Sequence, residues 1–219
     1  GTTVRFWGTN ASYWGGQMIY MEKLDGDRYA DFLARRGVNC VRIHVLHSTN
    51  SLMDTSRDDT QHMDPMKLDR LEYLLYALSK RGIYVNVDLM YHRMFGEGDG
   101  IDPELIRPER GNRDGDYNVS WAAGAAAFWH PRAIELNLAF YRNFLTHVNP
   151  YTGKALVDSP QMAMVTVNNE QSIFWGTTNM RRGRTAEILD EIFTSWLKNK
   201  YGTQAKLEDA WSVSGRSPL

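Results

Sequence analysis

Short apolar runs alternate along this chain with longer stretches in which apolar residues recur at helical spacing. The short runs are rich in β-branched residues and predict strands over residues 3–8, 38–46, 83–91 and 162–168. The longer stretches predict helices over residues 25–36, 65–81, 131–147, 185–201 and 204–211. Alternation of strand and helix indicates a parallel sheet that is covered by helices.

The helix that follows the second strand has the clearest boundaries. Asp64 is a good N-cap, Pro65 suits the first helical position, and Gly82 ends the helix. Its expected core face is a stripe of Leu68, Leu71, Leu74, Leu75 and Leu78. The core faces expected for the next two long helices are Ile134, Leu138, Tyr141 and Leu145, and then Ile188, Leu189, Ile192, Phe193 and Trp196.

Two α/β architectures contain such a sheet: an open doubly wound sheet and a closed (β/α)₈ barrel. The first strand is not followed by G-x-G-x-x-G, so the marker of a dinucleotide-binding fold is missing. A barrel needs eight βα units in roughly 250 residues, and this chain of 219 residues has four. We therefore expect residues 1–219 to be the N-terminal half of one barrel domain, with a long loop insertion at residues 93–130.

Composition and charge narrow the class of protein. A formal net charge of −1 lacks the basic excess of a nucleic-acid-binding protein. No apolar run approaches the length of a membrane span. We therefore expect neither nucleic acid nor a membrane as a partner. The single cysteine, Cys40, excludes an internal disulfide, and its apolar strand indicates a buried structural thiol.

The fourth strand ends abruptly in two amides and a carboxylate, Asn168-Asn169-Glu170. Such a cluster is costly to bury unless its groups are paired or used. In parallel α/β proteins the chemistry lies at the C-terminal tips of the strands. Glu170 is therefore the first candidate for a catalytic carboxylate, with Asn169 beside it.

Strand alternation gathers further polar side chains on one face near the strand ends. The groups that share a face are Arg42 with His44, Asp88 with His92, and Thr166 with Asn168 and Glu170. A lone histidine on a strand is more often a satisfied rim residue than a functional one. The coincidence on three strands predicts a shared pocket. Trp14 and Trp175 lie in loops, and we expect their flat rings to contact sugar.

The order of these motifs resembles the clan of retaining (β/α)₈ glycoside hydrolases that includes cellulases and β-mannanases. The residues that carry the resemblance are Gly37–Arg42, then Arg81–Asp88 leading to His92, and then Asn169-Glu170. The stretch from His147 to Lys154, which precedes Asp158-Ser159-Pro160, is similar to bacterial cellulase-like members. The resemblance spans most of the chain.

The resemblance implies hydrolysis of a β-linked poly- or oligosaccharide with retention and without a cofactor. Glu170 would be the general acid/base, and Asn169 would hydrogen-bond the sugar 2-hydroxyl. Arg42 would orient the nucleophile, and His92 would line the sugar subsite. In the clan the nucleophile ends the seventh strand, so it would lie outside this sequence.

A half-barrel exposes the edges of its first and last strands. We therefore expect pairing with the remaining half of the barrel or self-association, and little hydrolysis by residues 1–219 alone. Secretion or export to the periplasm is expected only by analogy with polysaccharide-degrading enzymes.

Two other functions fit the sequence. The first is a non-catalytic carbohydrate-binding or scaffold half-barrel, in which Glu170 only hydrogen-bonds a glycan. The second is a metal-dependent barrel hydrolase that uses His44 and His47 with acidic residues of the following loop. Against the second, the two histidines fall on opposite strand faces, and the loop lacks the calcium-binding pattern.

Overall fold

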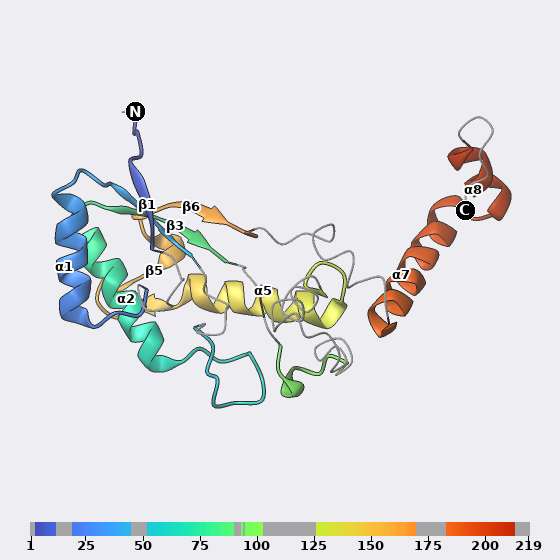
Figure 1. Ribbon diagram of the computed structural model, residues 1–219, viewed down its shortest axis with the longest axis horizontal. Coiled ribbons are helices and arrows are strands. Elements are labelled where there is room, and N and C mark those ends of the chain that lie inside the picture. The colour runs from blue at the N-terminus through green and yellow to red at the C-terminus, as the bar shows by residue number, and fades with distance from the viewer. Residues whose placement is uncertain are drawn as a thin grey trace. The chain divides into compact units, whose positions relative to one another are not determined.

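The computed structural model describes residues 3–11, 19–44, 52–89, 93, 95–102, 126–169 and 183–212 (Figure 1). The chain forms two compact units, residues 1–176 and residues 177–219. The first unit contains a parallel sheet with helices, and the second is a pair of helices.

The first unit is built on a four-stranded sheet in the order β1-β2-β3-β6, and all neighbouring strands are parallel. The strands are β1 (Gly8–Ala11), β2 (Cys40–Ile43), β3 (Tyr84–Asp88) and β6 (Met162–Thr166). The short strands β4 (Val148–Asn149) and β5 (Lys154–Ala155) form a separate antiparallel hairpin. The predicted α/β class and four parallel strands are confirmed, and the sheet is open rather than closed into a barrel.

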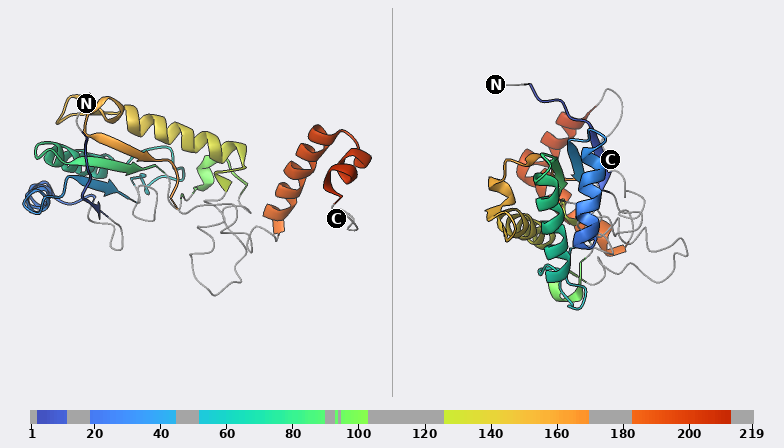
Figure 2. Two further views of the ribbon diagram at one scale, coloured as in Figure 1. Left: turned by 90° about the horizontal axis from the view of Figure 1, so that it is seen from above. Right: turned by 90° about the vertical axis from the view of Figure 1, so that its left-hand side faces the viewer.

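Three helices cover the sheet: α1 (Lys23–Ala34), α2 (Pro65–Ser79) and α5 (Pro131–Thr146). Helices α1 and α2 lie side by side (Figure 2). Short 3₁₀ turns, η1 (Glu97–Asp99) and η2 (Leu156–Asp158), lie in the connections.

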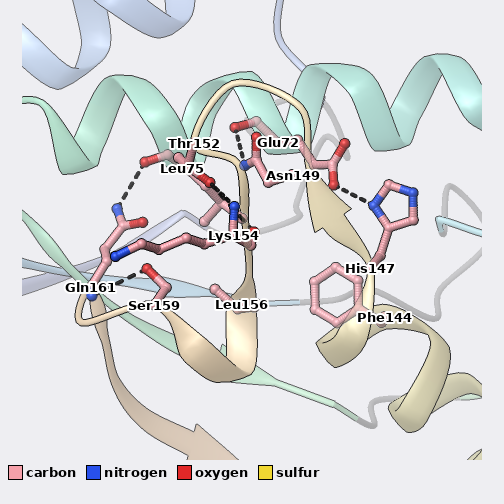
Figure 3. Close-up of a pocket in the computed structure, with 10 residues that line it drawn as sticks. All are labelled: Glu72, Leu75, Phe144, His147, Asn149, Thr152, Lys154, Leu156, Ser159 and Gln161. Carbon is pink, nitrogen blue, oxygen red and sulfur yellow. Dashed lines mark hydrogen bonds and ion pairs between the residues drawn. The ribbon is translucent and has the colours of Figure 1, made fainter.

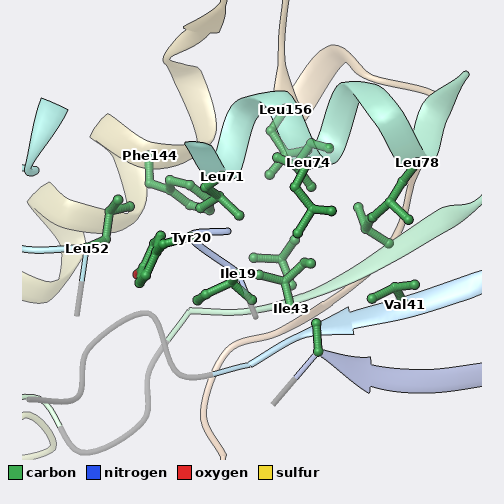
Figure 4. Close-up of a cluster of buried hydrophobic side chains, with 14 of the residues drawn as sticks. Ile19, Tyr20, Val41, Ile43, Leu52, Leu71, Leu74, Leu78, Phe144 and Leu156 are labelled. Carbon is green, nitrogen blue, oxygen red and sulfur yellow. The ribbon is translucent and has the colours of Figure 1, made fainter. Parts of the chain in front are cut away.

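One hydrophobic core joins these helices to one face of the sheet. Val41, Ile43, Val85 and Val87 alternate along β2 and β3 and are fully buried. Figure 4 shows leucines of α2 directed at this strand face. The residues between these valines and isoleucine lie on the opposite face, which is therefore the polar one.

The predicted boundaries of α2 are confirmed. The Asp64 side chain accepts hydrogen bonds from the backbone N–H of Met66 at 2.9 Å and of Lys67 at 3.1 Å. Pro65 occupies the first helical position. Gly82 has a φ of 69°, a left-handed conformation that suits glycine after a helix end.

The first strand begins later than the predicted residues 3–8 because the preceding segment is held by a side chain. The Asn39 amide accepts from the backbone N–H of Trp7 at 2.7 Å and donates to the carbonyl of Arg5 at 2.8 Å. The backbone N–H of Asn39 also donates to the Trp7 carbonyl at 3.0 Å, and regular strand pairing begins only with β1 at Gly8–Ala11.

The core face predicted for α5 is confirmed in part, because Tyr141 and Leu145 are partly buried and pack against the core. Its buried residues are Ala133, Leu136, Asn137, Phe140 and Phe144. Leu138, which was expected to be buried, is 57% exposed. Two stacked rings, Phe140 and Phe144, have centroids 5.9 Å apart and occupy the core instead. Burial of two aromatic rings outweighs burial of aliphatic residues at the neighbouring positions.

The second unit contains α7 (Gly183–Tyr201) and α8 (Gln204–Trp211), close to the predicted ranges. The indole Nε1 of Trp211 donates to the Tyr201 hydroxyl at 2.8 Å, which ties α8 to the end of α7. Phe193 stacks on Trp196, but Trp196 remains 46% exposed, contrary to the expected core position. No helix in the described part of the chain is long and apolar enough to cross a membrane.

A cavity of about 20 Å³ lies where the β4–β5 hairpin meets α2, at the N-terminal ends of the strands (Figure 3). This volume holds about one water molecule. Gln161 Nε2 donates to the carbonyls of Leu75 at 2.8 Å and Ile83 at 3.1 Å. The buried carboxylate of Glu72 lies 2.6 Å from His147 Nδ1. The cavity is too small for a sugar, and its polar groups join α2 to the sheet and hairpin.

Burial raises the pKa of Glu72, and the hydrogen bond to His147 opposes this effect only in part. Ionised Glu72 therefore destabilises the fold. This penalty is absent below about pH 4.5, where the carboxyl is protonated in both states, and it grows as pH rises through the higher folded-state pKa. Glu72→Gln keeps the side-chain size and removes the charge.

We expect the free energy of unfolding of Glu72→Gln to increase relative to that of wild type as pH rises from 4 to 7, so that the variant becomes the more stable of the two. Urea denaturation at several pH values measures this difference. Glu135→Gln is the matched control because its carboxylate is 67% exposed. An unchanged difference between pH 4 and 7 would contradict the prediction.

Candidate active site

The C-terminal ends of β2, β3 and β6 bring four polar side chains to one edge of the sheet. Arg42 belongs to β2, and His44 directly follows that strand. Asp88 is the last residue of β3, and its register partner in β6 is Thr166. Asn169 follows β6 by three residues. Because the strands are parallel, these groups meet at the edge where α/β enzymes carry their chemistry.

Asp88 is the centre of this cluster, and its side chain is fully buried. Its Oδ1 accepts from Arg42 Nε at 3.1 Å, and its Oδ2 lies 2.7 Å from Arg42 Nη2. The guanidinium thus binds the carboxylate through two donors, the strong bidentate form of an ion pair. His44 Nδ1 contacts the same Oδ2. The buried negative charge is compensated by groups from the neighbouring strand.

The Asn169 side chain is held by the same guanidinium. Arg42 Nη2 donates to Asn169 Oδ1, and an arginine can only donate. The amide oxygen therefore faces Arg42, and the amide NH₂ is at the other end of the group. Asn169 is 9% exposed, so its orientation is restricted by packing as well.

The polar face continues one step down the strands. Thr166 Oγ1 donates to Asn86 Oδ1 at 3.1 Å, and Asn86 is the register partner of Arg42. Asn86 and Asp88 lie on the same face of β3 because they are two residues apart. Polar pairs thus link β2, β3 and β6 on the side opposite the hydrophobic core.

The loops that follow β2 and β3 are bound to one another. Asp99 is fully buried and accepts from the Thr60 backbone N–H at 3.0 Å and the Thr60 hydroxyl at 2.7 Å. Arg93 Nη2 donates to the Thr60 carbonyl at 2.9 Å, and burial lowers the pKa of Arg93 to about 10. A Cβ on Gly96 would lie 2.0 Å from the Asp58 carbonyl oxygen, so only glycine permits this approach. Both loops leave from the edge that carries Arg42 and Asp88.

Three of the predicted site residues are brought together: Arg42, His44 and Asn169. The other four, Glu170, His92, Trp14 and Trp175, lie outside the described residues. Asp88 was placed on the polar face by alternation but was given no role, although it binds both Arg42 and His44.

Strand alternation grouped Asn168 with Thr166, yet Asn169 is the residue that reaches Arg42. The reason is that β6 ends at Thr166, so the two-residue period no longer holds beyond it.

The metal-dependent reading finds no support in the ranges that the structure describes. His44 binds Asp88 rather than the acidic loop, and His47 lies outside those ranges. The backbone N–H of Gln61 and the ring of His62 lower the pKa of Asp59 to about 2, so this carboxylate is already engaged. The described ranges contain no group of three or more histidine, cysteine, aspartate or glutamate side chains that could hold a metal ion.

No protein-family model and no curated protein sequence matches the chain. Solved structures do match it. The glycoside hydrolase family 5 mannosidase from Rhizomucor miehei has a TM-score of 0.54 and 19% identity, over 75% of this chain and 44% of that chain. A mutant of that mannosidase in complex with mannosyl-fructose has a TM-score of 0.54 and 18% identity, over 77% and 45% of the two chains.

The endo-β-1,4-mannanase from Thermotoga petrophila has a TM-score of 0.53 and 17% identity, over 95% of this chain and 41% of that chain. This chain therefore spans less than half the length of the chain in each of these three structures. At such low identity the likeness concerns the fold alone. The fold that the sequence predicted, a half-barrel of the (β/α)₈ type like that of glycoside hydrolases, is confirmed.

Proposed function

We propose that this chain supplies the first four βα units of a retaining glycoside hydrolase that cleaves a β-linked poly- or oligosaccharide. Glu170 is its general acid/base, and Asn169, Arg42 and His44 form the sugar-binding side of the site. The nucleophilic carboxylate comes from a strand outside this sequence. The reaction requires no cofactor.

The hydrogen bond between Arg42 and Asn169 carries this proposal. It fixes an amide NH₂ donor at the C-terminal edge of the sheet, and Glu170 is the next residue in the chain. In a retaining glycosidase a hydrogen bond to the sugar 2-hydroxyl strengthens in the oxocarbenium-like transition state. A donor held in advance needs little reorganisation when that state forms.

Asp88 does not fit the nucleophile. Its side chain is fully buried, and both of its oxygens accept hydrogen bonds from Arg42 or His44. A nucleophile must reach the anomeric carbon and lie about 5–5.5 Å from the acid/base carboxyl. We propose that the second catalytic carboxylate comes from a part of the barrel beyond the four strands.

The solved structures that resemble this chain are a mannosidase and a mannanase, and they support a choice of substrate class. We propose β-mannans and β-glucans as substrates, with His92, Trp14 and Trp175 as further sugar contacts. Loop side chains set the choice between the two.

Glycan binding without turnover is the second candidate function. One observation favours it: Asp88 is fully buried and is held by Arg42 and His44, so this carboxylate does not fit a nucleophile. Two results together would support this function: the wild-type protein and Glu170→Gln bind a mannan equally well, and neither protein hydrolyses it.

We expect Glu170→Gln to lower kcat on β-mannan or β-glucan by about 10²–10⁴-fold, the usual contribution of general acid/base catalysis. Reducing-sugar release by the natively expressed protein that contains this sequence measures the effect. The loss in rate should be smaller when an aryl glycoside with a good leaving group forms the covalent glycosyl-enzyme intermediate, because such a group departs without a proton.

Glu187→Gln is the matched control, since that carboxylate is 65% exposed and pairs with Arg184 within one helix. Full activity of Glu170→Gln on polysaccharide would contradict the assignment.

Asn169→Ala should lower kcat/KM by about 10²-fold, because a hydrogen bond to the 2-hydroxyl contributes several kcal/mol in the transition state. A 2-deoxyglycoside provides the control. Wild type should lose a similar factor on that substrate, while Asn169→Ala should lose little more. Independent, additive losses would show that Asn169 does not bind the 2-hydroxyl.

The two edge strands of the sheet predict association. Val165 is 37% exposed in β6, Val167 just beyond it is 61% exposed, and Trp7 before β1 is 69% exposed. Open edges with exposed apolar residues pair with other strands. We expect residues 1–219 alone to sediment as a dimer or a larger species. When the rest of the barrel is supplied, we expect a single complex of the two parts in place of the self-associated species. A folded, monodisperse monomer in analytical ultracentrifugation would contradict this prediction.

A further inference from the structure

A fully buried carboxylate joins the side chains of the candidate site. Asp88 is 0% exposed, is the last residue of β3, and binds the side chains of Arg42 and His44. It contacts no solvent, so it does not touch the sugar directly. Its effect on the site must pass through the side chains that it binds.

The carboxylate fixes the plane of the Arg42 guanidinium. Nε and Nη2 lie on the same side of that planar group and face the two oxygens of Asp88 at 3.1 and 2.7 Å. The same Nη2 also donates to Asn169 Oδ1. With two of its donors held by Asp88, the guanidinium cannot rotate without breaking the contact to Asn169. The direction of the Asn169 NH₂ group therefore depends on Asp88.

The carboxylate also fixes the tautomer of His44. An ionised carboxylate only accepts hydrogen bonds, so the His44 Nδ1 that contacts it must carry a proton. In the neutral ring Nε2 is then the nitrogen with a lone pair. The His44 side chain is 13% exposed, which leaves part of the ring accessible.

A role in stability alone would not require a buried carboxylate at Asp88. A buried ion pair contributes little net stability, and apolar replacement of such groups is often neutral or stabilising. Net stability alone therefore does not account for a buried carboxylate at this position.

We propose that Asp88 is a positioning residue, which directs the Asn169 amide through Arg42 and sets the His44 tautomer so that both face the sugar hydroxyls. This inference rests on the proposed glycosidase function for the meaning of the site. The positioning itself is a property of the free protein and is tested without any sugar.

The test is ¹⁵N NMR of the His44 ring and the Asn169 side-chain NH₂ in wild type and Asp88→Asn, at a pH where the ring is neutral. His44→Gln identifies the ring signals among the six histidines. We expect a protonated Nδ1 in wild type, a change to the Nε2–H form in Asp88→Asn, and a shift of the Asn169 NH₂ pair. Asp99→Asn is the matched control, because Asp99 is also fully buried but binds Thr60; it should leave both signals in place.

An Nε2–H tautomer in wild type would overturn the proposal, and so would an Asp88→Asn protein with both signals unchanged. The wild-type measurement decides the question even if Asp88→Asn does not fold. In a hydrolytically active protein, Asp88→Asn should lower kcat by about 10²-fold, as misplacement of a catalytic-site group does. The double variant with Asn169→Ala should be little worse than Asn169→Ala alone.

Failure of the proposed function and failure of this inference give different results. A wild-type protein that hydrolyses neither mannan nor glucan refutes the glycosidase assignment but leaves the NMR comparison able to support or overturn positioning by Asp88.

Discussion

The ion pair between Asp88 and Arg42 is the interaction on which the candidate site depends. It joins β2 to β3 through side chains at the point where both strands end. A carboxylate with no exposure must be compensated, and the guanidinium does so with two donors from one side. His44 and Asn169 then attach to opposite members of this pair. The ends of β2, β3 and β6 thus contribute four side chains to a single connected network.

The polar network is possible because one face of the sheet is apolar and packs against the helices, while the other face carries polar side chains. On one face Val41, Ile43, Val85 and Val87 bury fully against the helices and supply the hydrophobic stabilisation. On the other face Arg42, Asn86 and Asp88 occupy the intervening positions. Along β2 and β3 the side chains that stabilise the fold therefore alternate with the side chains that form the candidate site. At the opposite strand ends the side chain of Gln161 joins α2 to the sheet through the carbonyls of Leu75 and Ile83, which is a structural role.

Periodicity and caps were sufficient to predict the order of elements, the ends of α2 and the parallel sheet. They failed where a single side chain replaced a regular pattern. The Asn39 side chain binds the backbone of Arg5 and Trp7 before β1 begins, and the rings of Phe140 and Phe144 set the rotation of α5. Strand alternation placed Arg42, His44 and Asp88 on one face, but it could not give the partner of Asn169, because β6 ends before that residue. The central place of Asp88 was also beyond the sequence, since it arises from register between strands that are far apart in the chain.

The strands of the sheet stand in the same order as they occur along the chain, β1, β2, β3 and then β6. During synthesis each new strand therefore finds its partner already made and adds to the free edge of the growing sheet. No strand has to wait for one that emerges later, so the region can fold step by step from its N-terminus, as domains do on the ribosome. The site is completed at the last of these steps, when the segment after β6 delivers Asn169 to an arginine that β3 has already oriented.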